Sequence, residues 1–261
     1  MNTFSKEWLI DALLKINQQG WIPNARPGNA GGVGNTIEDL LGIKENNLPI
    51  PNATEWELKA QRLDTTSLTT LFHMEPSPRA LRFVPKVFLP KYGWQHEGAG
   101  TLYPLTEKSF RQTISGQGRS DRGFMVVVDH AAQKVMVSFD ATAVGTVHAT
   151  WLTEVAAVVG LGELKPQPYW GFRDLEHKAG TKLLNTFYVQ AEVKREAGLE
   201  YFHYTKVQIL RQFSFKGFLK AIEHGSVCVD FDARSGHNHG TKFRLRQNAL
   251  PELYDNITTI L

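Results

Sequence analysis

Apolar residues near the start of the chain recur at helical spacing. Leu9, Leu13 and Ile16 fall at positions i, i+4 and i+7, which puts them on one face of a helix. Gly20 follows as a helix stop. This pattern predicts an amphipathic helix from about residue 5 to residue 19.

Strand-like and helix-like runs alternate along the rest of the chain. Thr36 and Asp39 are spaced like a capping box, which predicts a short helix over 36–41. Gly42 would end it. The further elements predicted, in chain order, are strands over 54–61 and 67–72, a basic glycine-rich loop over 108–122, a hairpin over 124–129 and 134–139, a helix over 151–159, a strand over 201–210, a helix over 215–224, strands over 227–231 and 242–245, and a closing helix from about 250. This order predicts an α/β fold with a mixed sheet.

The composition indicates a chain with a sizeable core in a reducing, cytoplasmic setting. Its 261 residues are 42% hydrophobic, enough for one large domain or for one domain with two lobes. The net charge of +3 permits a nucleic-acid partner without requiring one. Cys228 is the one cysteine, which excludes a disulfide framework. Ser5, Lys6 and Glu7 directly precede apolar residues, unlike a signal peptide, and no apolar run is long enough to predict a membrane span.

The run from Glu55 to Lys59 carries the first candidate chemistry. On a strand, side chains two positions apart share a face, so Glu55, Glu57 and Lys59 point the same way. Trp56 and Leu58 then point into the core. A carboxylate beside an ammonium at a strand end can bind a divalent metal and handle an attacking water, as a Mg²⁺-dependent nuclease requires. A solvated strand that merely alternates acid and lysine is the competing interpretation.

Each residue of this motif has an expected role in phosphodiester hydrolysis. Glu57 would be a direct Mg²⁺ ligand, helped by the backbone carbonyl of Leu58. Lys59 would position or deprotonate the attacking water, or neutralise the phosphate. Glu38, on the preceding predicted helix, could reach the same cluster. Asn52 stands where such sites usually carry an aspartate.

A polar segment over 234–246 carries the second candidate chemistry. His237 and His239 lie there among basic residues and glycines, so the segment could hydrogen-bond base edges, and arginine pairs bidentately with guanine. A Zn²⁺ site at the His-x-His pair is the second interpretation, although no cysteine or further histidine cluster completes four ligands. A plain exposed polar loop is the third. Three arginines of the loop over 108–122 are predicted to contact phosphates: Arg111, Arg119 and Arg122.

Several runs, in chain order, resemble the MvaI/BcnI restriction endonucleases, a group in the MutH-like branch of the PD-(D/E)xK nucleases. The runs are 34–41, 45–48, 55–59, 68–73 and 237–244, the last of which looks like the family's HDHGTxFR segment with Asn238 in place of Asp. Residues 201–206 and 225–230 fall where the family has similar runs. The middle of the chain, about residues 76–195, is only loosely similar. Several ordered motifs are far more specific than a single Glu-x-Lys.

The resemblance implies a PD-(D/E)xK nuclease core with a mixed α/β sheet, in a MutH-like two-lobed domain with a DNA-binding cleft. Residues 1–261 would form this single domain, with a catalytic lobe that includes about 30–75 and a recognition lobe that includes about 200–246. It also implies a monomeric type II restriction endonuclease that cuts double-stranded DNA at a short CC-N-GG-like site with Mg²⁺. Such an enzyme acts in the cytoplasm of a bacterium or archaeon, away from membranes, with a cognate DNA methyltransferase as a genetic partner.

The resemblance assigns site residues by motif position. Those it implies to be catalytic are Glu57, Lys59, Asn52 and Glu38. Those it implies to hold the metal are Asn52, Glu57 and Leu58. Those it implies to contact DNA bases are His73, Asp230, His237, His239 and Arg244.

Asn52 is where the sequence departs from the family, which has its metal-binding aspartate five residues before the position of Glu57. An amide oxygen can still face a metal ion but brings no charge, so Mg²⁺ affinity and cleavage rate should fall. Two alternatives to a restriction endonuclease therefore stay open. One is a MutH-like repair nickase, and the other is a sequence-specific DNA-binding protein that has lost cleavage.

Overall fold

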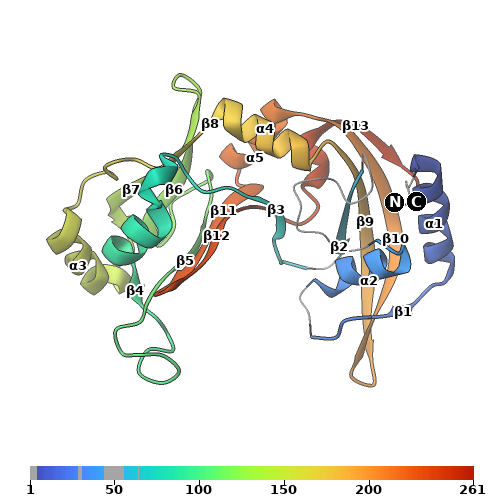
Figure 1. Ribbon diagram of the computed structural model, residues 1–261, viewed down its shortest axis with the longest axis horizontal. Helices are drawn as coiled ribbons and strands as arrows, with labels where there is room; N and C mark the ends of the chain where they lie inside the picture. The colour runs from blue at the N-terminus through green and yellow to red at the C-terminus, as the bar shows by residue number, and fades with distance from the viewer. Residues whose placement is uncertain (1–4, 29–30, 44–55, 64) are drawn as a thin grey trace. The chain divides into compact units, whose positions relative to one another are not determined.

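The computed structural model describes residues 5–28, 31–43, 56–63 and 65–261, which form two compact units (Figure 1). Unit 1 takes its described residues from three stretches of chain, 1–69, 177–217 and 246–261. Unit 2 comprises 70–176 and 218–245. Each unit is therefore built from segments far apart in the sequence.

Unit 1 is a mixed sheet with two helices on one face. Its elements are α1 (Lys6–Gln18), β1 (Ile22–Pro23), α2 (Gly32–Leu40), β2 (Glu57–Arg62), β9 (Asn185–Glu196), β10 (Leu199–Phe213), a 3₁₀ turn (Leu250–Leu253) and β13 (Tyr254–Thr259). The strand order is β1-β10-β9-β2, and β13 pairs with β10. β2 runs parallel to β9, and the other pairs described are antiparallel, so the predicted mixed sheet is confirmed.

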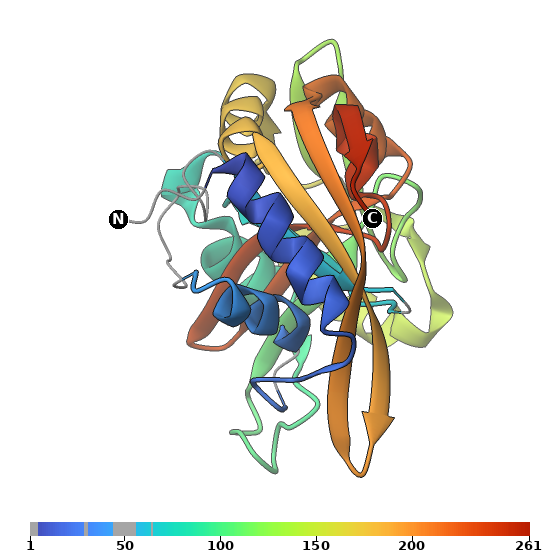
Figure 2. The ribbon, with the colours of Figure 1, turned by 90° about the vertical axis from the view of Figure 1, so that its right-hand side faces the viewer.

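The first helix forms as its pattern predicts. Ser5 caps α1 by accepting a hydrogen bond from the Trp8 amide at 3.2 Å. Leu9, Leu13 and Ile16 are buried against the sheet, and Figure 2 shows α1 lying across β9 and β10. The hydrophobic face of this helix therefore forms part of the unit 1 core.

A bulge in β10 keeps the apolar side of that strand facing the core. Phe202 and Tyr204 are buried at even positions, whereas Val207 and Ile209 are buried at odd ones. The strand register shifts between Tyr204 and Lys206, which adds one residue and reverses the alternation. One long strand can thus serve a single hydrophobic core.

Unit 2 contains a five-stranded sheet and a three-stranded sheet. Its strands are β3 (Thr69–His73), β4 (Trp94–Gln95), β5 (Lys108–Ile114), β6 (Arg122–Asp129), β7 (Lys134–Val144), β8 (Tyr169–Gly171), β11 (Val227–Arg234) and β12 (His237–Leu245). The sheet orders are β3-β12-β11-β5-β4 and β6-β7-β8. Its helical segments are a π-helical stretch (Val84–Tyr92) and α3 (Ala149–Val159), with the unit boundaries falling inside α4 (Phe172–Lys182) and α5 (Phe215–Glu223).

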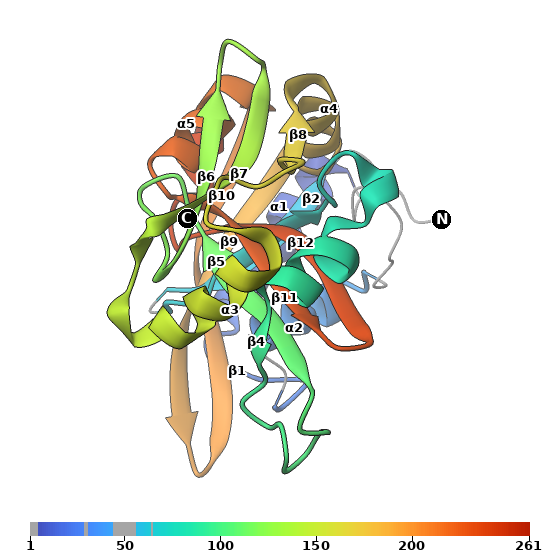
Figure 3. The same cartoon turned by 90° about the vertical axis from the view of Figure 1, so that its left-hand side faces the viewer.

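Aromatic side chains fill the core of unit 2. Phe88, from the π-helical stretch, stacks on Phe110 of β5 with ring centroids 4.8 Å apart. It also meets Phe124 and Phe231 edge-on. All four side chains are fully buried, and Figure 3 shows the β5–β11–β12 sheet behind this helical stretch and α3.

Most predicted elements are confirmed, and three are wrong. Thr36 lies inside α2 rather than at its start, and its hydroxyl accepts a hydrogen bond from the Ala25 amide, so it forms no capping box. The closing helix is a short 3₁₀ turn followed by β13. The loop over 108–122 contains β5, because Phe110 and Ile114 are buried along it. None of the helices that the structure describes is long and apolar enough to cross a membrane.

Candidate functional site

Strand β2 alternates between a core face and a polar face, as predicted. Trp56 and Leu58 are buried in the unit 1 core, and the Trp56 ring meets Phe187 of β9 edge-on at 4.9 Å. Glu57 and Lys59 point to the opposite face of the sheet. The sequence motif therefore lies on a strand whose other side is firmly anchored.

Glu57 and Lys59 form a close and largely buried ion pair. The Lys59 ammonium lies 2.7 Å from Oε1 of Glu57, and the two side chains are 18% and 7% exposed. The second oxygen of the carboxylate, Oε2, is buried and has no hydrogen-bond partner within the described chain. A buried anionic oxygen without a donor is costly, so this atom is well suited to bind a cation. The carboxylate thus fits the divalent metal ion that the motif predicts.

The neighbouring strand β9 extends this polar face. Thr186, Tyr188 and Gln190 lie opposite residues 57, 59 and 61 of β2 in parallel register. Thr186 shares a hydrogen bond of 2.7 Å with the hydroxyl of Tyr254. Burial raises the pKa of the Tyr254 phenol, and the nearby Glu57 carboxylate raises it further. Glu57 therefore sits beside a neutral, hydrogen-bonded hydroxyl pair.

Tyr188 orders the next position of this face. Burial raises the pKa of its phenol to about 12, so the hydroxyl keeps its proton at neutral pH. That hydroxyl donates to Oε1 of Gln61 at 2.6 Å. Sequence reasoning missed these β9 residues, although they alternate with the core residues Phe187, Val189 and Ala191, a strand period that could have identified them.

The remaining residues predicted near this site are Glu38, Asn52 and Glu55. Asn52 and Glu55 lie outside the described residues. Glu38 lies on α2, whose Val33 and Ile37 pack in the core cluster on the Leu58 side of the sheet. Its contact with the Glu57 cluster stays a prediction.

A second polar face lies in unit 2, on the side of β5, β11 and β12 opposite the aromatic core. Asp232 accepts from Arg111 at 2.8 Å and lies 3.4 Å from the Lys242 ammonium. Asp230 accepts from Thr113 at 2.8 Å and from Arg244 at 3.3 Å. The predicted contact residues Arg111, Asp230 and Arg244 therefore belong to one cross-strand charge network.

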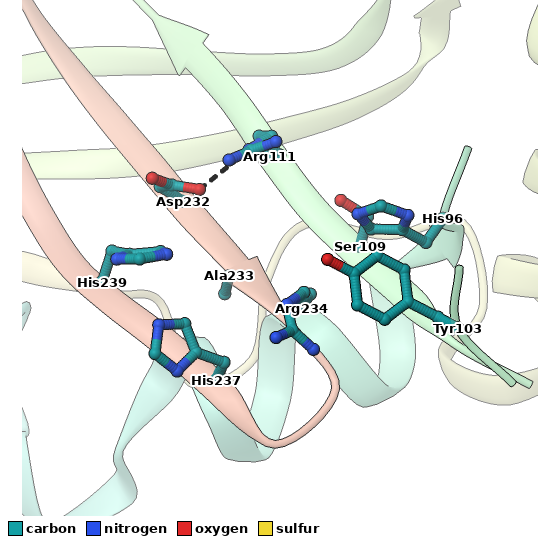
Figure 4. Close-up of a pocket in the computed structure, with 9 residues that line it drawn as sticks. All are labelled: His96, Tyr103, Ser109, Arg111, Asp232, Ala233, Arg234, His237 and His239. Atoms are coloured by element: carbon teal, nitrogen blue, oxygen red, sulfur yellow. Dashed lines mark hydrogen bonds and ion pairs between the residues drawn. The ribbon is translucent and has the colours of Figure 1, made fainter. Parts of the chain in front are cut away.

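The histidines of the predicted recognition segment lie on β12, close to a pocket of about 320 Å³ (Figure 4). The rings of His237 and His239 meet edge-on at 4.3 Å. Arg234 lies over the ring of Tyr103 at 4.6 Å and donates to Glu107 at 3.1 Å. The pocket therefore has donor groups along one wall and an aromatic ring that holds an arginine in place.

His73 lies at the exposed end of β3. The glycine opposite it, Gly240, has a φ of +81°, and a Cβ added there would lie 3.4 Å from the His73 ring. Glu75 fixes this part of β12 by accepting from the amide of Thr241 at 2.8 Å and from its hydroxyl at 3.1 Å. Glu75 carried no sequence signal, because its role depends on pairing with a strand 166 positions away.

Arg119 and Arg122 are engaged within unit 2. Arg122 lies over the rings of Trp94 and Trp151 at 4.0 and 5.2 Å, and burial lowers the pKa of its guanidinium. Arg119 donates to the Gly123 carbonyl at 2.9 Å. Phosphate contact by either arginine stays a prediction. Within the described ranges, no three histidine, cysteine or acidic side chains are grouped so as to hold a metal ion.

A family model described as the MvaI/BcnI restriction endonuclease family matches residues 10–254. The chain belongs to this family. MvaI/BcnI enzymes are type II site-specific deoxyribonucleases, which gives the class of enzyme. Restriction endonucleases of this kind use a divalent metal ion, typically Mg²⁺, and the unpartnered Glu57 oxygen is chemically suited to such an ion.

Two solved structures share the fold of this MvaI/BcnI chain. One is titled "Restriction endonuclease MvaI-cognate DNA substrate complex"; it is 24% identical, with a TM-score of 0.75 over 98% of this chain and 99% of that one. The other, "Restriction endonuclease MvaI in the absence of DNA", is 22% identical, with a TM-score of 0.55 over 100% of both. They support the predicted mixed α/β architecture. A comparison with curated proteins found no match.

Proposed function

We propose that this chain hydrolyses both strands of double-stranded DNA at a short CC-N-GG-like site with Mg²⁺, acting as a monomer. The observation that carries the proposal is the buried Glu57–Lys59 pair with its unpartnered carboxylate oxygen. The MvaI structure with cognate DNA supports DNA as the substrate. A cognate DNA methyltransferase would protect the host genome, and both proteins would act in the cytoplasm.

Three residues would hold the metal ion: Glu57 through its carboxylate, Leu58 through its carbonyl and Asn52 through its amide oxygen. Bound Mg²⁺ would supply positive charge against the crowded phosphate and lower the pKa of a coordinated water. The Lys59 ammonium lies beside Glu57, where it can neutralise a phosphate oxygen or hold the attacking water. Glu38 would add a further acid from α2.

The recognition groups would come from unit 2. Arg244, His237 and His239 offer donors suited to guanine, and His73 would contact the central base pair. Asp230 positions Arg244 by accepting its NH1 at 3.3 Å. Arg111, Arg119 and Arg122 are the proposed phosphate contacts. Such contacts would fix the orientation of the DNA without reading its sequence.

Digestion of plasmid DNA with Mg²⁺ tests this function directly. We expect discrete double-strand fragments, and sequencing their ends would give the site and the cleavage position. Glu57→Gln keeps the shape of the side chain but removes its charge, so we expect at least a ~100-fold lower rate, the scale of a lost electrostatic group. Single nicks confined to hemimethylated sites would instead identify a repair nickase.

Asn52 favours a second candidate function, sequence-specific DNA binding without cleavage. A site with one carboxylate fewer binds Mg²⁺ more weakly. A mobility shift on specific DNA together with intact plasmid, even at high Mg²⁺, would support this candidate over the nuclease.

A further inference from the structure

We propose that Gln61 is a substrate-binding residue whose side-chain amide donates a hydrogen bond to a phosphate oxygen of the DNA strand held at Glu57 and Lys59. The inference rests on the proposed nuclease function of that pair. Gln61 lies two positions beyond Lys59 on β2, so its side chain leaves the sheet on the same face.

The first observation is an unsatisfied donor. Gln61 is 5% exposed, and its Nε2 atom is buried without a hydrogen-bond partner among the residues described. Buried polar groups almost always find partners, so an orphan amide in a well-packed sheet calls for an explanation. A ligand that arrives with an acceptor would supply the missing partner.

The second observation is that the orientation of the amide is fixed. Burial raises the pKa of the Tyr188 phenol to about 12, although interactions with the Asn248 backbone and with Gln190 lower it. The phenol nevertheless stays protonated, so its one proton must go to an acceptor. That acceptor is Oε1 of Gln61, 2.6 Å away. The NH₂ end of Gln61 therefore faces away from Tyr188.

The third observation is the order of the polar side-chain groups along β2. Residues 57, 59 and 61 present an unpartnered carboxylate oxygen, an ammonium and an unpartnered amide donor. Strand geometry separates the first and the last by about 13 Å, too far for the two orphan groups to satisfy each other. The donor and the adjacent ammonium both complement anionic oxygens, and a DNA backbone offers these at regular spacing.

Binding measurements without divalent metal test the contact independently of cleavage. The probe is a short duplex with a CC-N-GG-like site, compared with duplexes in which one phosphate at a time is a neutral methylphosphonate. For Gln61→Glu, which keeps the acceptor for Tyr188 but replaces the donor with an anion, we expect about 10-fold weaker binding to unmodified DNA. Neutralising the facing phosphate should then strengthen binding by this variant while weakening it for the unmodified protein.

Gln61→Leu is the second variant, because a buried glutamate could impair folding. This variant should bind unmodified DNA more weakly than the unmodified protein does. Replacing the facing phosphate with a methylphosphonate should then weaken its binding little further. Such non-additive effects are expected when residue 61 and that phosphate are in direct contact. Gln208→Leu is the matched control, since that glutamine lies in the same sheet and its amide donates to Thr259. It should behave like the unmodified protein at every phosphate.

Two outcomes separate this inference from the proposed function. If no phosphate position couples to residue 61, or if every position responds equally, Gln61 does not touch the backbone and the inference is wrong. If one phosphate position couples to residue 61 but plasmid stays intact with Mg²⁺, the contact between Gln61 and the backbone is supported. The proposed cleavage by this chain is then wrong.

Discussion

Asn52 determines how much negative charge the β2 site can offer a cation. Replacing it with aspartate adds a second carboxylate, and hard divalent cations bind charged oxygen ligands more tightly than neutral ones. We therefore expect Asn52→Asp to raise the Mg²⁺-dependent cleavage rate at least ~10-fold and to lower the Mg²⁺ concentration required. Initial rates of plasmid cleavage across a Mg²⁺ titration would measure both.

Asn256→Asp is a suitable control for that experiment, because it adds the same charge on β13, outside the runs that resemble the family. If Asn52→Asp cleaves plasmid no faster than the unmodified protein, a second carboxylate gives the site no advantage and the prediction is wrong. The prediction rests on the position of Asn52 five residues before Glu57.

At the scale of residues, the sequence predicted interactions between residues that are close together in the chain. It missed interactions between residues that only folding brings together. Glu57 and Lys59 are two positions apart on one strand, so strand periodicity alone placed them together. Tyr188 and Gln61 are 127 positions apart, and nothing in either segment predicts their hydrogen bond. Only the parallel register of two strands brings them together.

At the scale of elements, β11 carries a charge network that should make stability depend on pH. Burial raises the pKa of Asp232, but the hydrogen bond and charge of Arg111 and the charges of Lys242 and His239 outweigh it. The folded-state pKa of Asp232 is therefore below its ordinary value. The stability that this carboxylate contributes is present above its unfolded value, about 3.9, and is lost as pH falls through the folded value.

We expect Asp232→Asn to lower the free energy of unfolding by about 1 kcal/mol near pH 7, the scale of partly exposed ion pairs. The difference from the unmodified protein should shrink as the pH falls below about 3.9. Urea unfolding at a series of pH values would measure it, with Asp255→Asn on the exposed part of β13 as a control. A difference that persists at acid pH would rule out the charge network as its cause.

Two elements with a clear period were predicted correctly, whereas the end of the chain was not. The helix α1 and the β6–β7 hairpin follow their apolar spacing closely. The structure at the end of the chain differs from the predicted helix. Leu250 and Leu253 are spaced as on a helix, but they form one 3₁₀ turn before β13. β13 is a short and mostly exposed edge strand, and only its pairing with β10 defines it.

At the scale of the whole molecule, a net charge of +3 is too small to hold DNA by itself. Binding should depend on a few local cations, and each neutralised phosphate contributes about −0.9 to the slope of log K against log salt. We expect Arg111→Ala to reduce the size of that slope by about 1. Affinities measured between about 50 and 200 mM NaCl would give the slope.

Lys15→Ala on the exposed side of α1 removes the same charge away from the predicted contact face and should leave the slope unchanged. If Arg111→Ala leaves the slope unaltered, Arg111 pairs only with Asp232 and does not neutralise a phosphate.

The parallel pairing of β2 with β9 has a consequence during protein synthesis. Glu57 pairs with a strand that begins at Asn185, so the ribosome must add more than half of the chain before that strand can support the site. A truncated product that ends before β9 lacks Tyr188, Thr186 and the core residues beneath Leu58. We expect such fragments to be harmless to the genome of the cell that makes them, which protects the cell from its own unfinished nuclease.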